Sequence, residues 1–152
     1  MARTVEVIGR VALDPEDAAA VWRDVRRWPG FVEGLQRIEE QGSDWPGEGA
    51  KVVWVSGAGG RGRVTEKVVA NHAAAFSTRV AESRLLGTQS IRFEPAGRGG
   101  SDARLALEYE LVGENPLGGL VDLLFIRRAL RDSLARTLAR FSVEAQEDAG
   151  LR

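Results

Sequence analysis

The chain has 152 residues, with no cysteine, one histidine, and 21 basic against 22 acidic side chains, which gives a formal net charge of −1. These counts exclude a disulfide framework, a metal held by cysteines or by two imidazoles, and a thiol nucleophile. The balanced charge argues against a protein that neutralises many nucleic-acid phosphates. A chain of this length predicts one domain, which we place at residues 1–146 with a short tail at 147–152, and we expect neither a metal nor a cofactor.

The first segment predicts a strand followed by two short helices. Residues 4–13 alternate apolar and polar side chains, as a half-buried strand does. Asp14 is suited to cap a helix and Pro15 to its first turn, and apolar side chains then recur on one helical face. The sequence Trp-Pro-Gly at 28–30 predicts the end of this helix, and residues 31–35 predict a short second one.

Six further strands are predicted in the middle of the chain, because alternating segments are separated by short breaks rich in glycine and polar residues. Such a succession indicates an antiparallel meander with one face in water. The Gly-rich segment 57–62 joins two strands and precedes no helix, so it predicts a hairpin or a lid at a pocket mouth and not a phosphate loop. His72 falls in a predicted turn, where we expect it to be exposed. The strands are placed at 36–41, 51–56, 63–70, 75–82, 87–94 and 103–112.

Residues 117–145 predict one long helix, because apolar side chains recur at spacings of three and four without an internal proline. About 26 helical residues span roughly 39 Å, so this helix must lie across the whole sheet. The predicted fold class is α+β: a curved seven-stranded antiparallel sheet, two short helices after the first strand, and the long helix packed across the concave face. Because a curved sheet and a long helix cannot touch along their full length, we expect an apolar cavity between them.

Five arginines gather near the C-terminus. We interpret this cluster as the solvated face of the long helix, with a protein-interaction surface and a site for anionic membranes or RNA as alternatives. No apolar run reaches the ~18 residues of a membrane span, and the N-terminus lacks the pattern of a secretory signal. We therefore expect a soluble, cytoplasmic monomer or homodimer with no nucleic-acid partner and no stable membrane insertion. The arginines are Arg127, Arg128, Arg131, Arg136 and Arg140.

The sequence at residues 21–31, Val-Trp-Arg-Asp-Val-Arg-Arg-Trp-Pro-Gly-Phe, resembles the element that joins the two short helices in the START-like (SRPBCC) superfamily. Residues 49–52 and 93–95 are similar to two further markers of that superfamily, and the resemblance covers nearly the whole chain. It is strongest for the small bacterial polyketide cyclase/dehydrase and lipid-transport branch. The resemblance implies a Bet v 1-like helix-grip fold with a deep pocket for an apolar or amphipathic small molecule, such as a lipid, a polyketide or an isoprenoid. The markers belong to the fold and are not catalytic.

The aromatase/cyclase branch of the superfamily carries tryptophans and an arginine on the fourth and fifth strands. The corresponding residues 63–68 contain no tryptophan here, which argues against authentic aromatase/cyclase chemistry. Two functions therefore remain open. The first is the binding of an apolar small molecule, and the second is a polyketide cyclase or dehydratase that uses one or two polar residues of the cavity.

The candidate ligand contacts are side chains that the strand pattern turns inward, that border the pocket in the superfamily, or that belong to the apolar repeat of the long helix. Alternation alone does not decide whether Trp54 points inward. Thr78, Gln89 and Tyr109 are the polar ones and could orient a ligand carbonyl or hydroxyl, or could bond one another or a buried water. The full set is Trp28, Phe31, Trp54, Phe76, Thr78, Gln89, Ile91, Phe93, Leu107, Tyr109, Leu120 and Leu124.

Glu66, Arg79 and Tyr109 are the candidate catalytic residues. If Val64, Glu66 and Val68 face the cavity, Glu66 is a desolvated carboxyl with a raised pKa and could act as a general base. If the alternate residues face the cavity, Glu66 is solvated. We favour the solvated orientation, because a sheet with one wet face normally exposes its charges.

Overall fold

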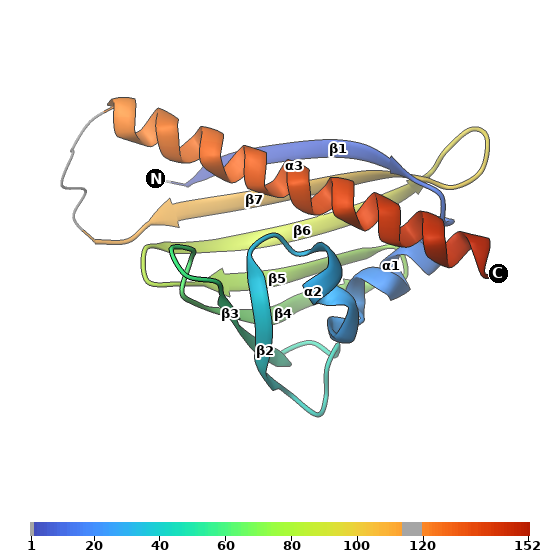
Figure 1. Ribbon diagram of the computed structural model, residues 1–152, viewed down its shortest axis with the longest axis horizontal. Coiled ribbons are helices and arrows are strands. Elements are labelled where there is room, and N and C mark those ends of the chain that lie inside the picture. The colour runs from blue at the N-terminus through green and yellow to red at the C-terminus, as the bar shows by residue number, and fades with distance from the viewer. Residues whose placement is uncertain (1, 114–119) are drawn as a thin grey trace.

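The computed structural model describes residues 2–113 and 120–152. Within these residues a single antiparallel sheet has the strand order β1-β7-β6-β5-β4-β3-β2 and curves around one long helix (Figure 1). This arrangement confirms the predicted α+β helix-grip fold. The strands are β1 (Arg3–Val11), β2 (Leu35–Gln41), β3 (Lys51–Ser56), β4 (Arg63–His72), β5 (Ala75–Ala81), β6 (Leu85–Pro95) and β7 (Ser101–Leu111), and the helices are α1 (Pro15–Arg23), the 3-10 turn η1 (Val25–Arg27), α2 (Trp28–Phe31) and α3 (Leu120–Gly150).

The break between the two short helices lies earlier than the sequence predicts. Asp24 adopts an extended conformation, and its side chain accepts a hydrogen bond from the backbone N–H of Arg26, which ends α1 and starts η1. Residues 28–30 then belong to the second helix, and the expectation that they terminate the first is wrong. Pro29 is tolerated there because the first turn of a helix does not need its N–H groups for internal hydrogen bonds.

Three other local expectations change. The backbone carbonyl of Asp14 accepts the first hydrogen bond of α1, but its side chain accepts from the N–H of Gly100 and does not cap the helix. His72 is exposed as expected, yet it is the last residue of β4 and not part of a turn. Helix α3 continues to Gly150, so most of the expected tail at 147–152 is helical.

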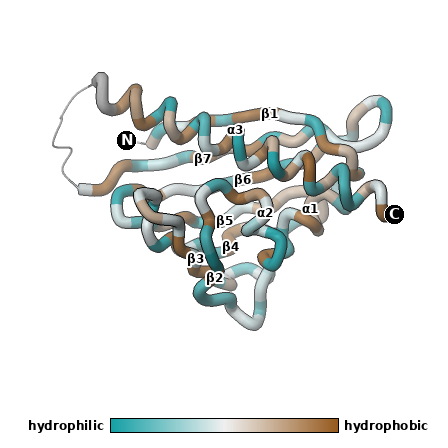
Figure 2. The backbone as a smooth tube through the Cα atoms, viewed as in Figure 1, coloured by the Kyte–Doolittle hydropathy of each residue, from teal (hydrophilic) through white to brown (hydrophobic). Residues whose placement is uncertain are grey.

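The concave face of the sheet and three helices enclose an aromatic core at the C-terminal end of α3. Trp22 and Phe31, from α1 and α2, lie 5.0 Å from the ring of Phe141 in α3. Phe93 of β6 lies 5.7 Å from the same ring. Figure 2 shows how apolar and polar positions alternate along the strands that supply the floor of this core. The C-terminal half of α3 therefore packs on a filled interior.

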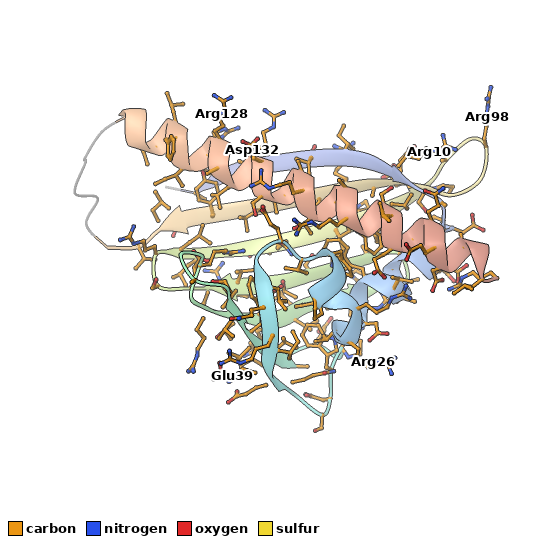
Figure 3. The ribbon with its side chains drawn as sticks, in the orientation of Figure 1. Arg10, Arg26, Glu39, Arg98, Arg128 and Asp132 are labelled. Carbon is orange, nitrogen blue, oxygen red and sulfur yellow. The ribbon has the colours of Figure 1, made fainter. Side chains whose placement is uncertain are left out.

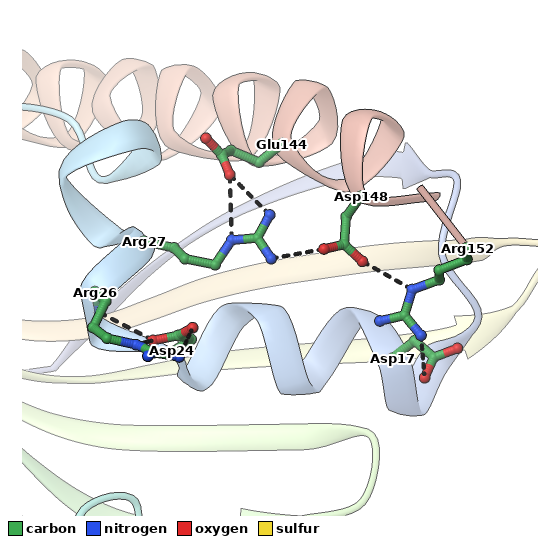
Figure 4. A network of polar contacts seen from close by, with 7 residues as sticks. All are labelled: Asp17, Asp24, Arg26, Arg27, Glu144, Asp148 and Arg152. Carbon is green, nitrogen blue, oxygen red and sulfur yellow. Dashed lines mark hydrogen bonds and ion pairs between the residues drawn. The ribbon is translucent and has the colours of Figure 1, made fainter. Parts of the chain in front are cut away.

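Ion pairs hold the same half of α3 in place (Figure 4). Arg27 lies 3.1 Å from Glu144 and 2.8 Å from Asp148, and Arg152 lies 2.8 Å from Asp148 and 3.3 Å from Asp17. Each partly exposed pair contributes only about 0–1 kcal/mol, but together they connect α1, η1 and the end of α3. None of the helices in residues 2–113 and 120–152 is both long and apolar enough to span a membrane.

Candidate ligand cavity beneath the long helix

A cavity of about 260 Å³ lies between the N-terminal half of α3 and the sheet. Its floor comes from β6 and β7, its wall from α3, and its rim from the loop between β3 and β4 and the turn between β5 and β6. Most of the lining is apolar. The lining residues are Arg61, Glu82, Gln89, Leu107, Phe125, Ile126, Ala129, Leu130, Ser133 and Leu134.

The periodicity of the two elements explains why these side chains meet. Ile126, Leu130 and Leu134 are spaced by four residues, so they lie on one face of α3. Gln89 and Leu107 are direct partners in the pairing of β6 with β7, and both point to the concave side. The curvature of the sheet separates these two surfaces and leaves the cavity.

Two opposite charges, Arg61 and Glu82, form an ion pair at the rim of the cavity. Arg61 donates through Nε to the carboxylate of Glu82, and its guanidinium lies over the ring of Trp54, 5.5 Å from the ring centroid. The Gly-rich segment 57–62 is the predicted hairpin loop. Gly62 has a φ of +75°, which suits glycine, and its N–H donates to Ser56 Oγ at 2.8 Å. This tight loop places Arg61 at the cavity.

Glu66 is buried, with 4% of its surface exposed, so the favoured prediction of a solvated Glu66 is wrong. Val64 and Val68 are buried beside it, and this face of β4 is therefore the concave one. Trp54 Nε1 donates to one carboxyl oxygen and Thr78 Oγ1 to the other, both at 2.8 Å. These donors on β3 and β5 replace water, which is why a carboxyl is tolerated inside the sheet.

Burial raises the pKa of the Glu66 carboxyl, and the hydrogen bonds from Trp54 and Thr78 and the charge of Arg61 oppose this effect without cancelling it. The carboxyl does not belong to the cavity lining. It lies behind Trp54, over which the guanidinium of Arg61 is placed. Glu66 can therefore act on a ligand only after a rearrangement of these side chains.

The other two catalytic candidates lie in different surroundings. Tyr109 is buried on β7 opposite Gly87, and its hydroxyl has no hydrogen-bond partner among the described residues. A buried hydroxyl without a partner costs about 1–3 kcal/mol. Tyr109 does not line the cavity, so its hydroxyl reaches a ligand there only after a rearrangement. Arg79 is exposed and donates to Thr88 Oγ1 at 3.3 Å on the opposite face of the sheet.

Of the predicted ligand contacts, Gln89 and Leu107 line the cavity, whereas Trp54 and Thr78 hold Glu66 behind it. Leu124 is 56% exposed and outside the lining, and the side chain of Leu120 lies outside the described residues. The remaining contacts pack in the core or beside it. They are Trp28, Phe31, Phe76, Ile91, Phe93 and Tyr109. The Nε1 of Trp28 donates to the backbone carbonyl of Trp22.

Sequence reasoning did not identify the cavity wall on α3. Ile126 belongs to the apolar repeat of the predicted helix, but nothing in the sequence shows which part of that repeat faces the sheet. Leu124 lies roughly 200° around the helix axis from Ile126, so the two cannot both face the cavity. Arg61 and Glu82 were also missed. A charged residue at each of two neighbouring turns was the available signal.

The site can bind and orient a ligand, and it offers few groups for bond-breaking. Among the described residues no group of three or more histidines and carboxylates could hold a metal ion. The polar groups of the lining are the paired Arg61 and Glu82, the carboxamide of Gln89 and the hydroxyl of Ser133.

Solved structures share this architecture at low sequence identity. TTHA0849 from Thermus thermophilus matches with a TM-score of 0.78 and 18% identity, covering 96% of this chain and 99% of that chain. A START superfamily protein from Mycobacterium smegmatis matches with a TM-score of 0.75 and 12% identity, covering 95% and 97%. The ZhuI aromatase/cyclase from Streptomyces sp. R1128 matches with a TM-score of 0.70 and 16% identity, covering 99% and 94%. At these identities the likeness shows the fold alone.

Comparison with curated protein sequences returns no match. The family described as polyketide cyclase/dehydrase and lipid transport matches residues 2–146, which is nearly the whole chain. This match over nearly the whole chain shows that the chain belongs to that family.

Proposed function

We propose that the protein binds an apolar or amphipathic small molecule, such as a lipid, a polyketide or an isoprenoid-like compound, in the cavity between α3 and the sheet. The observation that carries this proposal is the cavity lining, which is mostly apolar and has a few polar groups, with Arg61 and Glu82 at the rim. Burial of apolar surface contributes roughly 25 cal/mol for each Å², and a few polar groups orient the ligand.

The size of the cavity limits the ligand. Pockets for drug-sized molecules have volumes of roughly 300–1,000 Å³, and this cavity has about 260 Å³. In the described conformation it therefore suits a small or partly inserted molecule. A longer chain would leave through the side where Phe125 is exposed, or would require the N-terminal half of α3 to move outward.

The rim favours a neutral polar group over a free carboxylate. Nε of Arg61 already donates to the carboxylate of Glu82, so an incoming carboxylate would be repelled by the negative charge of Glu82. A carbonyl or hydroxyl oxygen carries no such penalty. It can accept from the terminal nitrogens of Arg61, which have no hydrogen-bond partner among the described residues, or bond to the carboxamide of Gln89.

Binding of the neutral fluorophore Nile red, and its displacement by lipids, quinones and polyketides, tests the proposal. Ala129 and Ala135 are both exposed alanines of α3, but only Ala129 lines the cavity. We expect Ala129→Phe to fill the cavity and to displace an equal part of the ligand into water. Burial of an apolar group of that size is worth about 1.5–3 kcal/mol, so binding should weaken roughly tenfold or more. Ala135→Phe is the matched control and should bind like the wild type. Equal affinity of the two variants would contradict the site.

A cyclase or dehydratase is the second candidate, and the buried carboxyl of Glu66 is the observation that favours it. A raised pKa suits a group that exchanges protons near neutral pH. The experiment is turnover of a poly-β-keto thioester, followed by absorbance, in the wild type and in Glu66→Gln. Loss of turnover with unchanged Nile red affinity supports the enzyme. No turnover by the wild type, or equal turnover by the variant, rejects it.

A further inference from the structure

The end of β7 and the beginning of α3 lie at the same end of the molecule (Figure 1). Several apolar side chains of these segments are exposed. Leu124 is 56% exposed and Phe125 72% exposed in the first turns of α3. Val112, directly after the end of β7, is exposed as well. Single exposed apolar residues are ordinary, but a group of them at one end of a domain marks an interaction surface.

This apolar group is continuous with the cavity. Phe125 lines the cavity together with Ile126 and Ala129, and most of its surface is nevertheless open to solvent. Leu124, one residue earlier, does not line the cavity and contributes only to the outer surface. A molecule that leaves the cavity past Phe125 therefore arrives at the exposed apolar end.

Unpaired cations flank the same turns of α3. Arg127, Arg128 and Arg131 are exposed and have no ion-pair partner among the described residues. Figure 3 shows Arg128 projecting from this half of α3, with Asp132 one turn further along. Elsewhere Arg136 is paired with Glu33, so the predicted arginine cluster is divided into a paired part and a free part. Guanidinium groups beside exposed leucine and phenylalanine are typical of surfaces that bind anionic lipids.

We propose that the beginning of α3 docks on an anionic lipid surface, with Leu124 and Phe125 entering the boundary between headgroups and acyl chains and with Arg127, Arg128 and Arg131 contacting lipid phosphates. Phe125, which lines the edge of the cavity, then lies at the lipid surface. A symmetric contact between two copies of the chain would bring the same arginines against each other, which is unfavourable. The positive charge therefore selects the lipid surface over a second copy.

Docking on lipid rests on the proposed function and extends it, because an apolar ligand resides in membranes. The binding of the protein to vesicles is nevertheless measured without any ligand. The experiment is co-sedimentation of the full chain with vesicles of phosphatidylcholine alone and of phosphatidylcholine mixed with phosphatidylglycerol. We expect binding only to the mixed vesicles, weakened by added salt. Arg128→Glu and Arg131→Glu should each lower the affinity at least roughly fivefold, and Leu124→Ser roughly tenfold.

The matched control is Arg98→Glu, an equal charge change at an exposed arginine in the β6–β7 turn, at the opposite end of the molecule (Figure 3). It should bind vesicles like the wild type. The proposal is overturned if Arg98→Glu and Arg128→Glu weaken binding equally, if phosphatidylcholine alone binds as well, or if Leu124→Ser changes only the dimerisation of the free protein. Nile red binding without vesicles reports separately on the cavity, so the failure of one proposal does not imply failure of the other.

Discussion

The substitution Glu66→Gln tests the account of the buried carboxyl. The amide has nearly the same shape as the carboxyl. Its oxygen can accept from Trp54 Nε1, and its NH₂ group can donate to Thr78 Oγ1, whose hydroxyl can reverse its direction. Both neighbours therefore keep a partner, and at low pH the variant and the wild type should differ by less than about 1 kcal/mol.

The two proteins should diverge as the pH rises. The ordinary pKa of a glutamate carboxyl is 4.5, and burial raises that of Glu66 in the folded protein. Between the two values the folded protein retains a proton that the unfolded chain has released, so the free energy of unfolding falls as the pH increases. One proton gives a slope of at most about 1.4 kcal/mol for each pH unit. The amide does not titrate, so Glu66→Gln should lack this slope and become the more stable protein above the ordinary value.

Urea unfolding followed by tryptophan fluorescence between about pH 5 and about pH 8 measures this difference. Subtracting the wild type from the variant removes the titrations that both share. Glu94→Gln, the same substitution at an exposed position of β6, is the matched control. A difference between Glu66→Gln and the wild type that stays constant with pH would refute the reasoning, as would a variant destabilised by several kcal/mol at every pH.

Three further substitutions have calculable costs in free energy of unfolding, each measured by urea unfolding at neutral pH. Trp54→Phe removes the indole donor to the buried carboxyl and should cost about 1–3 kcal/mol, and it should cost less when the carboxyl has been replaced by an amide. Arg27→Met removes the link to the end of α3 and should cost about 1 kcal/mol, less in high salt, whereas Arg26→Met, which pairs only with a near neighbour in sequence, should change stability little. Gly87→Ala places a Cβ 2.5 Å from a backbone oxygen of β7 and should cost about 1–3 kcal/mol, while Gly57→Ala, with open space around it, should cost less than about 1 kcal/mol.

The order of the strands and the long helix was predictable because alternation and helical spacing are local properties. The sequence predicts residues 51–56 at their observed bounds, because Gly49 precedes and Gly57 follows the apolar pattern. The ends of β6 and β7 were less accurate. Leu85 and Ser101 join the strands through pairing with a neighbour, which a single segment does not reveal.

The candidate site depended on facts that no single segment contains. Alternation divides β4 into two faces but cannot say which one is concave, and Glu66 was misplaced for this reason. Its donors Trp54 and Thr78 lie twelve residues away in either direction and come together only when β4 pairs with both β3 and β5. In the same way, the helical repeat does not say whether Leu124 or Ile126 faces the sheet, because that depends on how α3 is rotated about its axis.

The two halves of α3 differ in how freely their sequence can change. Phe141 and the ion pairs around Arg27 fasten the C-terminal half, so substitutions there affect the whole fold. The half that bears Ile126 and Ala129 borders the cavity and carries few fully buried side chains. Substitutions of these two residues therefore alter the cavity at a small cost in folding free energy. The shape of the cavity can thus diverge between related proteins through the first turns of one helix while the remainder of the domain stays constant.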